Sequence, residues 1–331
     1  MPESGRLFLS VIVPVYNEEE SLRPFVEELS EVLSKIPQSW EAILIDDGSK
    51  DGSYAAIQEI CRRFPGFKAV RLGRNAGQTA ALSAGIDRAR GELIVCLDAD
   101  GQNDPRDIPA MLVKIEEGYD VVSGWRKNRK DPWLSRRLPS QIANGIISWS
   151  TGVPLHDYGC TLKIYRARYL KSLPLYGEMH RFIPAFAGFL GARIAETEVH
   201  HRPRTRGSSK YGISRTFKVV LDLLTVKFMD AYLAKPIYLF GGGGVLLGLT
   251  GAALAAVTLY KKMVLGIFVK DQPLFLVSIF FAIVGFQLIL MGLLAEILIR
   301  IYFDIKGKPA YFVRETAGFL DSSGASKLES V

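Results

Sequence analysis

The sequence predicts an α/β domain built on a mostly parallel sheet, followed by two transmembrane helices. In the N-terminal part of the 331-residue chain, short apolar runs typical of buried strands alternate with helical segments of about 10–15 residues. Toward the C-terminus, two long segments contain no charged residue, which is typical of helices that cross a membrane. These two observations together predict a globular part and a membrane part.

Alternating strands and helices favour parallel strands with helices on both faces of the sheet. We expect strands over residues 7–15, 41–45, 67–72, 92–97 and 119–123. Helices are expected over residues 17–35, 53–64, 79–89 and 105–117, with Asn17 as the first N-cap. Ligands of such sheets bind at the carboxyl ends of the strands. Polar side chains follow three of these ends: Tyr16, Asn17 and Glu18, then Asp46 and Asp47, then Asp98 and Asp100.

Two basic loops follow the fifth strand. The first, over residues 125–137, is rich in Arg, Lys and Trp and leads to an amphipathic helix near residues 140–150. The second covers residues 200–211 and contains small residues that allow movement. Apolar residues at helical spacing over residues 214–234 then predict an amphipathic helix that lies along a membrane surface.

Pro236–Tyr260 and Pro273–Ala295 are uncharged over 25 and 23 residues. At about 1.5 Å per residue, each can cross a hydrocarbon core of about 30 Å, which favours membrane spans over buried core helices. We therefore expect a globular domain over residues 1–212, an interfacial helix over 213–235, a transmembrane hairpin over 236–303 and a cytosolic tail over 304–331.

The lysines and arginines beside the two spans differ little in number between the two sides of the membrane, so they do not fix the orientation of the spans. We therefore take the expected orientation from the N-terminus. Residues 1–9 lack the pattern of a signal peptide. We expect a multi-pass protein of the cell inner (plasma) membrane, with the globular domain and both termini in the cytosol. Three cysteines without a CxxC spacing predict neither a zinc site nor a redox pair.

The net charge of +7 is compatible with nucleic acid, anionic lipid or phosphorylated substrates as partners. No nucleic-acid-binding motif is recognisable, and the basic residues gather in loops near the apolar segments. The sequence therefore favours a membrane and phosphate ligands and predicts no nucleic acid.

Asp98-Ala99-Asp100, with Gln102 close behind, gives the strongest chemical signal. Carboxylate oxygens are ligands that Mg²⁺ prefers, and substrate phosphates often complete its shell. A metal ion there would stabilise a diphosphate leaving group, whereas the alternative is a solvated acidic turn.

Asp46-Asp47-Gly48-Ser49 is a turn in which one aspartate is expected to have a structural role. The other can accept hydrogen bonds from a nucleobase. Pro14, Tyr16 and Glu18 would then line the same pocket.

Several of these motifs together resemble the family-2 glycosyltransferases of the GT-A fold. They are Val-Ile-Val-Pro-Val-Tyr-Asn-Glu (11–18), Ile-Asp-Asp-Gly-Ser (45–49), Gly-Arg-Asn-Ala-Gly (73–77) and Asp-Ala-Asp-Gly-Gln (98–102). Gly-Trp-Arg (124–126) and Gly-Ser-Ser-Lys-Tyr (207–211) resemble the branch that contains dolichol-phosphate mannose synthases and bactoprenol-phosphate glucosyltransferases. The two C-terminal helices are similar to those of the bacterial glucosyltransferases.

The resemblance implies a role for each matching residue. The nucleoside would be contacted by Pro14, Tyr16, Glu18, Ile45 and Asp47. Asp98 and Ala99 would approach the ribose and diphosphate, and Mg²⁺ or Mn²⁺ would be held by Asp98, Asp100 and Gln102. The phosphates would be contacted by Arg126, Arg204 and Lys210.

Residues 155–161 depart from the family pattern. Related enzymes show an acidic residue followed by Gly-Phe-Arg, whereas this chain has Asp157 and then Thr161-Leu162-Lys163. Together with Asp100, Asp157 is the candidate catalytic residue, either positioning the acceptor phosphate or acting as a base. A polyprenyl phosphate is already an anion, so the need for a base stays open. Lys163 is the candidate replacement for the arginine that contacts the acceptor phosphate.

We expect transfer of a hexose, glucose from UDP-glucose in first place, to polyprenyl (undecaprenyl) phosphate at the cytosolic membrane face. Transfer from GDP-mannose, as in dolichol-phosphate mannose synthases, is the first alternative. A processive polysaccharide synthase is the second, although its QxxRW motif is absent from the sequence. A non-catalytic membrane scaffold is the third, against which the intact Asp98, Asp100, Arg126 and Lys210 argue. A homo-oligomer is left open.

Overall fold

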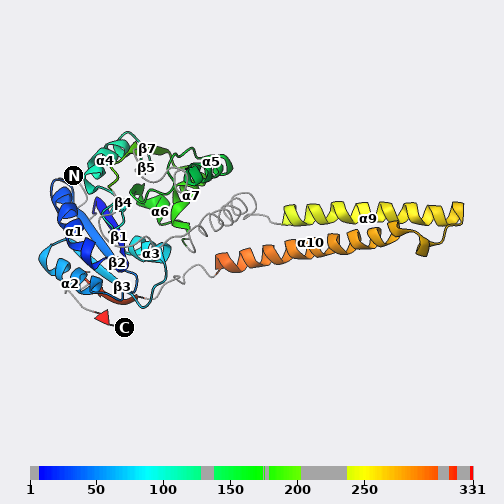
Figure 1. The fold of residues 1–331 in the computed structure, drawn as a ribbon, viewed down its shortest axis with the longest axis horizontal. Helices are drawn as coiled ribbons and strands as arrows, with labels where there is room; N and C mark the ends of the chain where they lie inside the picture. The colour runs from blue at the N-terminus through cyan, green and yellow to red at the C-terminus, as the bar shows by residue number, and fades with distance from the viewer. Residues whose placement is uncertain are drawn as a thin grey trace. The chain divides into compact units, whose positions relative to one another are not determined.

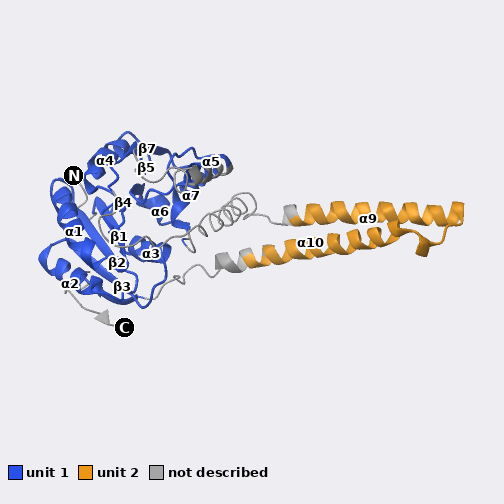
Figure 2. Cartoon of the chain, in the orientation of Figure 1, with its two compact units in different colours: residues 1–224, 309–331 blue, residues 225–308 orange. Residues whose placement is uncertain are grey.

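The computed structural model describes residues 7–127, 138–173, 175, 179–202, 237–304, 313–318 and 329–330. The chain divides into two compact units (Figure 2). Unit 1 comprises Met1–Leu224 and Pro309–Val331, and unit 2 comprises Thr225–Lys308. The expected interfacial helix over 213–235 lies outside the described residues.

Unit 1 contains one sheet to which nine strands of the described residues contribute (Figure 1). These are β1 (Leu9–Val15), β2 (Trp40–Asp46), β3 (Phe67–Leu72), β4 (Leu93–Cys96), β5 (Val121–Trp125), β6 (Lys163–Arg166), β7 (Ile194–Glu198), β8 (Val313–Ala317) and β9 (Glu329–Ser330). Their order across the sheet is β7-β5-β6-β4-β1-β2-β3-β8-β9. The pairs among β1 to β4 are parallel, as is β5 with β7, whereas β6, β8 and β9 pair antiparallel with their neighbours.

The α/β fold with a mostly parallel sheet is therefore confirmed. Each of the five expected strands begins and ends within two residues of the observed one. The helices between them are α1 (Glu19–Ser34), α2 (Ser53–Arg63), α3 (Gln78–Arg88) and η1 with α4 (Pro105–Asp107 and Ile108–Glu116). The expected N-cap was wrong, because Glu18 takes that position. Asn17 instead has a φ of 52°, which suits the sharp turn after β1.

Helices cover both faces of the sheet because the strand side chains are apolar on both sides (Figure 1). Alternate residues of β1, such as Val11 and Val13, pack with α1, α2 and α4 on one face. Ile12 and Ile45 pack with α3 on the other face, together with α6 (Ala167–Leu170) and α7 (Ile183–Phe189). The strand residues of both clusters are buried, so the sheet provides a rigid base for the side chains at its carboxyl edge.

The segment after the second apolar helix contributes a strand that we did not expect. Residues 304–331 are predicted as a tail, yet β8 pairs antiparallel with β3, from Leu72 opposite Val313 to Ala69 opposite Ala317. Three of the five residues of β8 are polar, so its sequence carries no strand signal of its own. The open edge of β3 supplies the partner that makes this short segment a strand.

Unit 2 consists of α9 (Ile237–Leu265), a short turn with η4 (Val269–Asp271), and α10 (Pro273–Asp304). Phe240–Leu265 and Pro273–Ala295 are long and apolar enough to cross a membrane, and most of their surface is exposed. The two helices pack closely at glycines. A Cβ atom on Gly244 would lie 2.5 Å from the carbonyl oxygen of Gly285, so this contact excludes larger residues.

Candidate active site

The acidic residues predicted to bind a metal ion lie just after β4. Gln78, the first residue of α3, donates a hydrogen bond from Nε2 to Oδ1 of Asp98 at 2.8 Å. The backbone N–H of Gln102 donates to Oδ1 of Asp100 at 3.1 Å, across the positive-φ turn at Gly101. Burial and the nearby Asp100 carboxylate raise the pKa of Asp98 to about 7. The two carboxylates thus lie close enough to repel each other, and a bound cation would remove this repulsion.

These residues fit a divalent cation of the oxygen-binding type. Asp98 and Asp100 supply carboxylates, and Gln102 supplies a side-chain amide. In the described part of the chain, no group of three or more His, Cys, Asp or Glu side chains is placed to hold a metal ion. A cation with only two carboxylates keeps positions for substrate phosphates, as Mg²⁺ sites at nucleotides commonly do.

The two aspartates at the end of β2, Asp46 and Asp47, both have structural partners in the described residues. Asp47 accepts hydrogen bonds from the backbone N–H groups of Ala76 and Gly77, at 2.7 and 3.0 Å. Burial raises the pKa of Asp47 despite these two bonds. Oδ1 of Asp46 accepts from the backbone N–H of Ser49 at 3.1 Å. Asp47 therefore holds the loop that begins α3, which is a role beyond the nucleoside contact that the resemblance implies.

The turns after β1 and β2 are joined to each other. Asn17 donates its backbone N–H to Oγ of Ser49 at 3.0 Å, and its Oδ1 accepts from the N–H of Lys50 at 2.8 Å. Tyr16 and Glu18 flank Asn17 and are half-buried, as is Pro14. Their side chains border the carboxyl edge, where the predicted nucleoside contacts require them.

Two other residues of the expected nucleoside and diphosphate set lie in the core. Ile45 is fully buried and packs beneath α3, and Ala99 is almost fully buried on the opposite face. Contacts of these two residues with a ligand would have to come from their backbone atoms.

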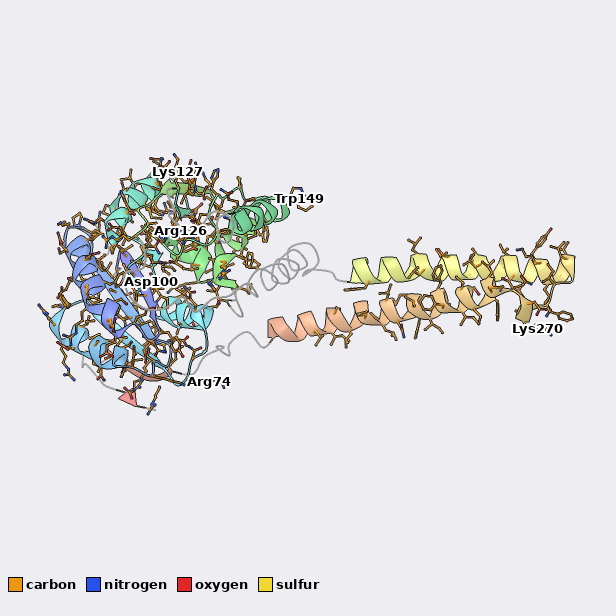
Figure 3. The ribbon with its side chains drawn as sticks, viewed as in Figure 1. Arg74, Asp100, Arg126, Lys127, Trp149 and Lys270 are labelled. Atoms are coloured by element: carbon orange, nitrogen blue, oxygen red, sulfur yellow. The ribbon has the colours of Figure 1, made fainter. Side chains whose placement is uncertain are left out.

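Arg126 and Asp157 form a bidentate ion pair directly after β5 (Arg126 is labelled in Figure 3). Nε of Arg126 lies 2.7 Å from Oδ2 of Asp157, and Nη2 lies 2.9 Å from Oδ1. Both side chains are about one-tenth exposed. Such a pair fixes the plane of the guanidinium. Asp157 is thus placed to orient the guanidinium of Arg126, which is the expected phosphate contact, and action as a base would require Asp157 to leave that guanidinium.

Lys163 lies behind this loop. It is 3% exposed, on β6, and its ammonium donates to the backbone carbonyls of Tyr158, at 3.1 Å, and Cys160. Burial lowers the pKa of Lys163. The predicted contact with an acceptor phosphate would require the ammonium to leave both carbonyls, so the geometry favours a role in shaping the loop.

Glu196 on β7 is a site residue that the sequence does not reveal. Its Oε1 accepts from the backbone N–H groups of His156 and Asp157, at 2.8 and 3.2 Å. Its Oε2 lies 2.7 Å from Nδ1 of His156, whose ring stacks on Trp125. Glu196 therefore holds the turn that presents Asp157 to Arg126, and only the tertiary fold brings these residues together.

A cavity of about 540 Å³ opens beside the Arg126–Asp157 pair. One wall is α5 (Leu138–Thr151), which presents hydroxyl and amide side chains. The other wall carries the cations of Arg126 and Lys127. The lining residues are Trp125, Arg126, Lys127, Ser140, Gln141, Asn144, Gly145, Ser148, Pro154, Leu155, His156 and Asp157.

The expected phosphate contacts Arg204 and Lys210 lie outside the described residues. The described chain reaches Arg202, whose backbone N–H donates to the carbonyl oxygen of Gln102 at 2.9 Å. The guanidinium of Arg202 is fixed by Glu28 and Asp104, at 2.8 and 2.7 Å. The second basic loop therefore begins beside the expected metal site.

Comparison with known proteins gives the site a family context. Residues 10–189 match the family model "Glycosyl transferase family 2". A dodecaprenyl-phosphate galacturonate synthase of Rhizobium johnstonii is 46% identical over 313 residues, which is 93% of each chain. An undecaprenyl-phosphate 4-deoxy-4-formamido-L-arabinose transferase of Shewanella sediminis is 40% identical over 314 residues, covering 93% of this chain and 92% of the other.

Solved structures share the fold at low identity. The mannosyl-3-phosphoglycerate synthase of Rubrobacter xylanophilus matches with a TM-score of 0.53 at 15% identity, over 68% of this chain and 74% of the other. The glucosyl-3-phosphoglycerate synthase of Mycobacterium tuberculosis, in complex with Mn²⁺ and UDP-glucose, matches with 0.51 at 17% identity, over 67% and 79%. The GT-A architecture of unit 1 agrees with the resemblance read from its motifs.

Proposed function

The chain belongs to glycosyl transferase family 2, and on that premise we propose that it transfers a hexuronic acid, galacturonic acid in first place, from a nucleotide sugar to polyprenyl phosphate. It is a glycosyltransferase, and polyprenyl phosphate is the acceptor class of its full-length relatives. The sugar is the finer part of the proposal. It is supported by the relative that is 46% identical, which is named for galacturonate. Glucose, expected from the sequence, and mannose remain as competing donors in the test below.

The observation that carries the acceptor proposal is the fixed guanidinium of Arg126, which lines the cavity beside α5. Its bidentate contact with Asp157 keeps it in one orientation, which lowers the entropy that phosphate binding would cost. Arg126 also lies close enough to Asp98 to lower the pKa of that carboxyl, against the effect of burial. An acceptor phosphate on Arg126 would therefore meet a sugar whose diphosphate is held near Asp98 and Asp100.

The reaction joins an oxygen of the lipid phosphate to the anomeric carbon of the sugar. The bond between that carbon and the nucleoside diphosphate breaks, and the diphosphate leaves with the electron pair. A divalent cation at Asp98, Asp100 and Gln102 would neutralise the charge on the leaving diphosphate. Arg126 would orient the attacking phosphate, and Asp157 would keep Arg126 in place. Because the attacking phosphate is already an anion, the site needs no base.

Membrane association agrees with the two exposed apolar helices and with an acceptor that is itself a lipid. We propose two membrane crossings, with unit 1 in the cytosol. Support comes from β8, which follows α10 in the chain and pairs with β3. Both flanks of unit 2 must then lie on one side of the membrane, which requires an even number of crossings.

The test uses the purified full-length protein with polyprenyl phosphate and radiolabelled donors. UDP-galacturonic acid, UDP-glucose and GDP-mannose are compared, with Mg²⁺ or Mn²⁺ and with EDTA. We expect a single labelled lipid product, formed fastest from UDP-galacturonic acid. A faster reaction with UDP-glucose would overturn the sugar, and a labelled polymer would favour a polysaccharide synthase. The absence of transfer from any donor would favour a scaffold.

A further inference from the structure

Four side chains on three neighbouring strands and one helix form a charged cluster at the outer side of the sheet. Glu315 of β8 lies directly opposite Arg71 of β3, and Oε1 of Glu315 is 3.7 Å from Nη1 of Arg71. The guanidinium carbon of Arg71 lies 4.3 Å above the centre of the Tyr54 ring. Nε of Arg71 is 3.4 Å from Oδ2 of Asp46. Arg71 thus lies beside two carboxylates and an aromatic ring, with about a quarter of its side chain exposed.

Arg71 provides the positive charge near a completely buried carboxylate. Asp46 has no exposed side-chain surface, and within the described residues its Oδ2 makes no hydrogen bond. A buried carboxylate without a cation would be costly. Burial and the nearby Glu315 carboxylate raise the pKa of Tyr54 to about 12, so the ring beneath Arg71 stays neutral. The orientation of Asp46 therefore depends on Arg71.

Asp46 connects this cluster, through hydrogen bonds, to the residues expected to contact the nucleoside. Its Oδ1 holds the backbone of Ser49, and Oγ of Ser49 in turn accepts from the backbone of Asn17. Asn17 has a positive φ, a conformation that costs a residue with a side chain free energy and needs such support. The residues on either side of Asn17 are Tyr16 and Glu18, the expected nucleoside contacts.

We propose that Glu315, on the strand that follows the membrane unit, is a positioning residue for nucleotide-sugar binding. It holds Arg71 against Asp46, and Asp46 fixes the two turns that carry Tyr16 and Glu18. The inference rests on the proposed function in taking the donor to be a nucleotide sugar, whose nucleoside Tyr16 and Glu18 are expected to contact. It assigns the C-terminal strand to the donor side of the reaction and not to the acceptor side.

The experiment measures UDP and GDP binding to the purified full-length protein by calorimetry, without lipid acceptor. The nucleotide that binds the wild type is used for all variants. A partly exposed ion pair contributes up to about 1 kcal/mol, so Glu315→Gln should weaken binding by about twofold to fivefold. Glu315→Asp, which keeps the charge, should recover part of the loss. Arg71→Gln should weaken binding more, and the double variant should be no weaker than Arg71→Gln.

Saturation curves for the two substrates give a second readout, because a strand that only stabilised the fold would not change one KM value and leave the other unchanged. Glu315→Gln should raise the KM for the nucleotide sugar and leave the KM for polyprenyl phosphate unchanged. The matched control is Glu117→Gln, which removes the same charge from a surface pair with Lys114 at 2.8 Å and should bind nucleotide normally.

Wild-type nucleotide affinity in Glu315→Gln would overturn the inference, as would equal changes in both KM values with a lower melting temperature. A wild type that binds a nucleotide but transfers no sugar to polyprenyl phosphate would refute the proposed function alone. A wild type that binds neither nucleotide would refute both.

Discussion

Asp157 fixes the orientation of the Arg126 guanidinium through two hydrogen bonds. The planar shape of the guanidinium, and not only its charge, can therefore be tested. A lysine would keep the charge but lose the two-pronged contact. We expect Arg126→Lys to raise the KM for polyprenyl phosphate by about tenfold or more, equivalent to about 1.4 kcal/mol. The KM for the nucleotide sugar should change little. Two saturation curves, one for each substrate, measure the difference.

Asp157→Asn separates orientation from base catalysis. If Asp157 orients Arg126, this variant should also act mainly on the KM for the lipid. A steep loss of turnover with an unchanged lipid KM would instead identify Asp157 as a base and contradict the present assignment.

Asp100 is the third residue for which the structure supports a sharp prediction. Asp100→Asn removes one carboxylate charge at nearly constant shape. We expect turnover to fall by about 100-fold or more, because the leaving diphosphate loses several kcal/mol of charge stabilisation. Mn²⁺ affinity, measured by electron paramagnetic resonance, should fall in parallel, while the melting temperature stays near that of the wild type. Full activity of the wild-type protein in excess EDTA would be incompatible with this role.

The residues that we propose to contact charged ligands are recognisable in the sequence, whereas the residues that support them are not. Asp98, Asp100 and Arg126 lie in short motifs beside the strand ends, where their chemistry is recognisable. Glu196 and Glu315 act through partners that are far away in the sequence and look like ordinary surface glutamates. Lys163 looks like a phosphate ligand from its position in the chain, but β6 buries it.

Among the elements, the connection between β7 and the second basic loop depends on one buried aspartate. Asp104 accepts hydrogen bonds from Arg106 at 2.6 Å and from Arg202 at 2.7 Å. Burial alone would raise the pKa of Asp104, but the bonds from Arg106 and Arg202 outweigh it and hold the pKa well below its ordinary value. A lowered pKa in the folded state adds stability above the unfolded pKa, and this stability is lost as the pH falls.

We therefore expect the melting temperature to decrease between about pH 5 and pH 2, and part of that decrease should be absent in Asp104→Asn. At pH 7 the variant should lose about 1.5–3 kcal/mol of stability, because charged hydrogen bonds are removed. Glu59→Gln, which breaks an exposed pair with Arg23, is the matched control and should show the wild-type pH dependence. An unchanged pH profile in Asp104→Asn would show that other carboxylates control acid stability.

A helix or strand can be predicted from the sequence when the residues of that element alone show its hydrophobic pattern. The strands from β1 to β5 are apolar runs between helices, so periodicity alone locates them. β6 has a charged residue at each end of its four positions, and three of the five residues are polar in β7 and in β8. These strands exist because neighbouring strands offer unpaired edges, a condition that no window of sequence contains.

For the whole molecule, the sharpest prediction concerns the side of the membrane on which each part lies. Lys270 is exposed in the turn between α9 and α10 (Figure 3), and Arg62 is exposed on α2. In intact cells we expect a cysteine at position 270 to react with a membrane-impermeant maleimide, and one at position 62 to react only after the cells are opened. A chain with Cys61→Ser as background removes the one partly exposed native thiol among the described residues. Equal labelling of both positions before the cells are opened would refute the two-crossing arrangement.

The late position of β8 in the chain also has a consequence for how the protein is made. A ribosome releases β3 long before β8, and the two apolar helices of unit 2 are synthesised in between. During that interval the backbone N–H and C=O groups on the outer side of β3 have no neighbouring strand from this chain. Such an open edge invites pairing with other chains. The sheet can therefore be completed only after the two apolar helices have been synthesised. A chain that ends after α10 would keep the edge of β3 unpaired and would be prone to aggregation.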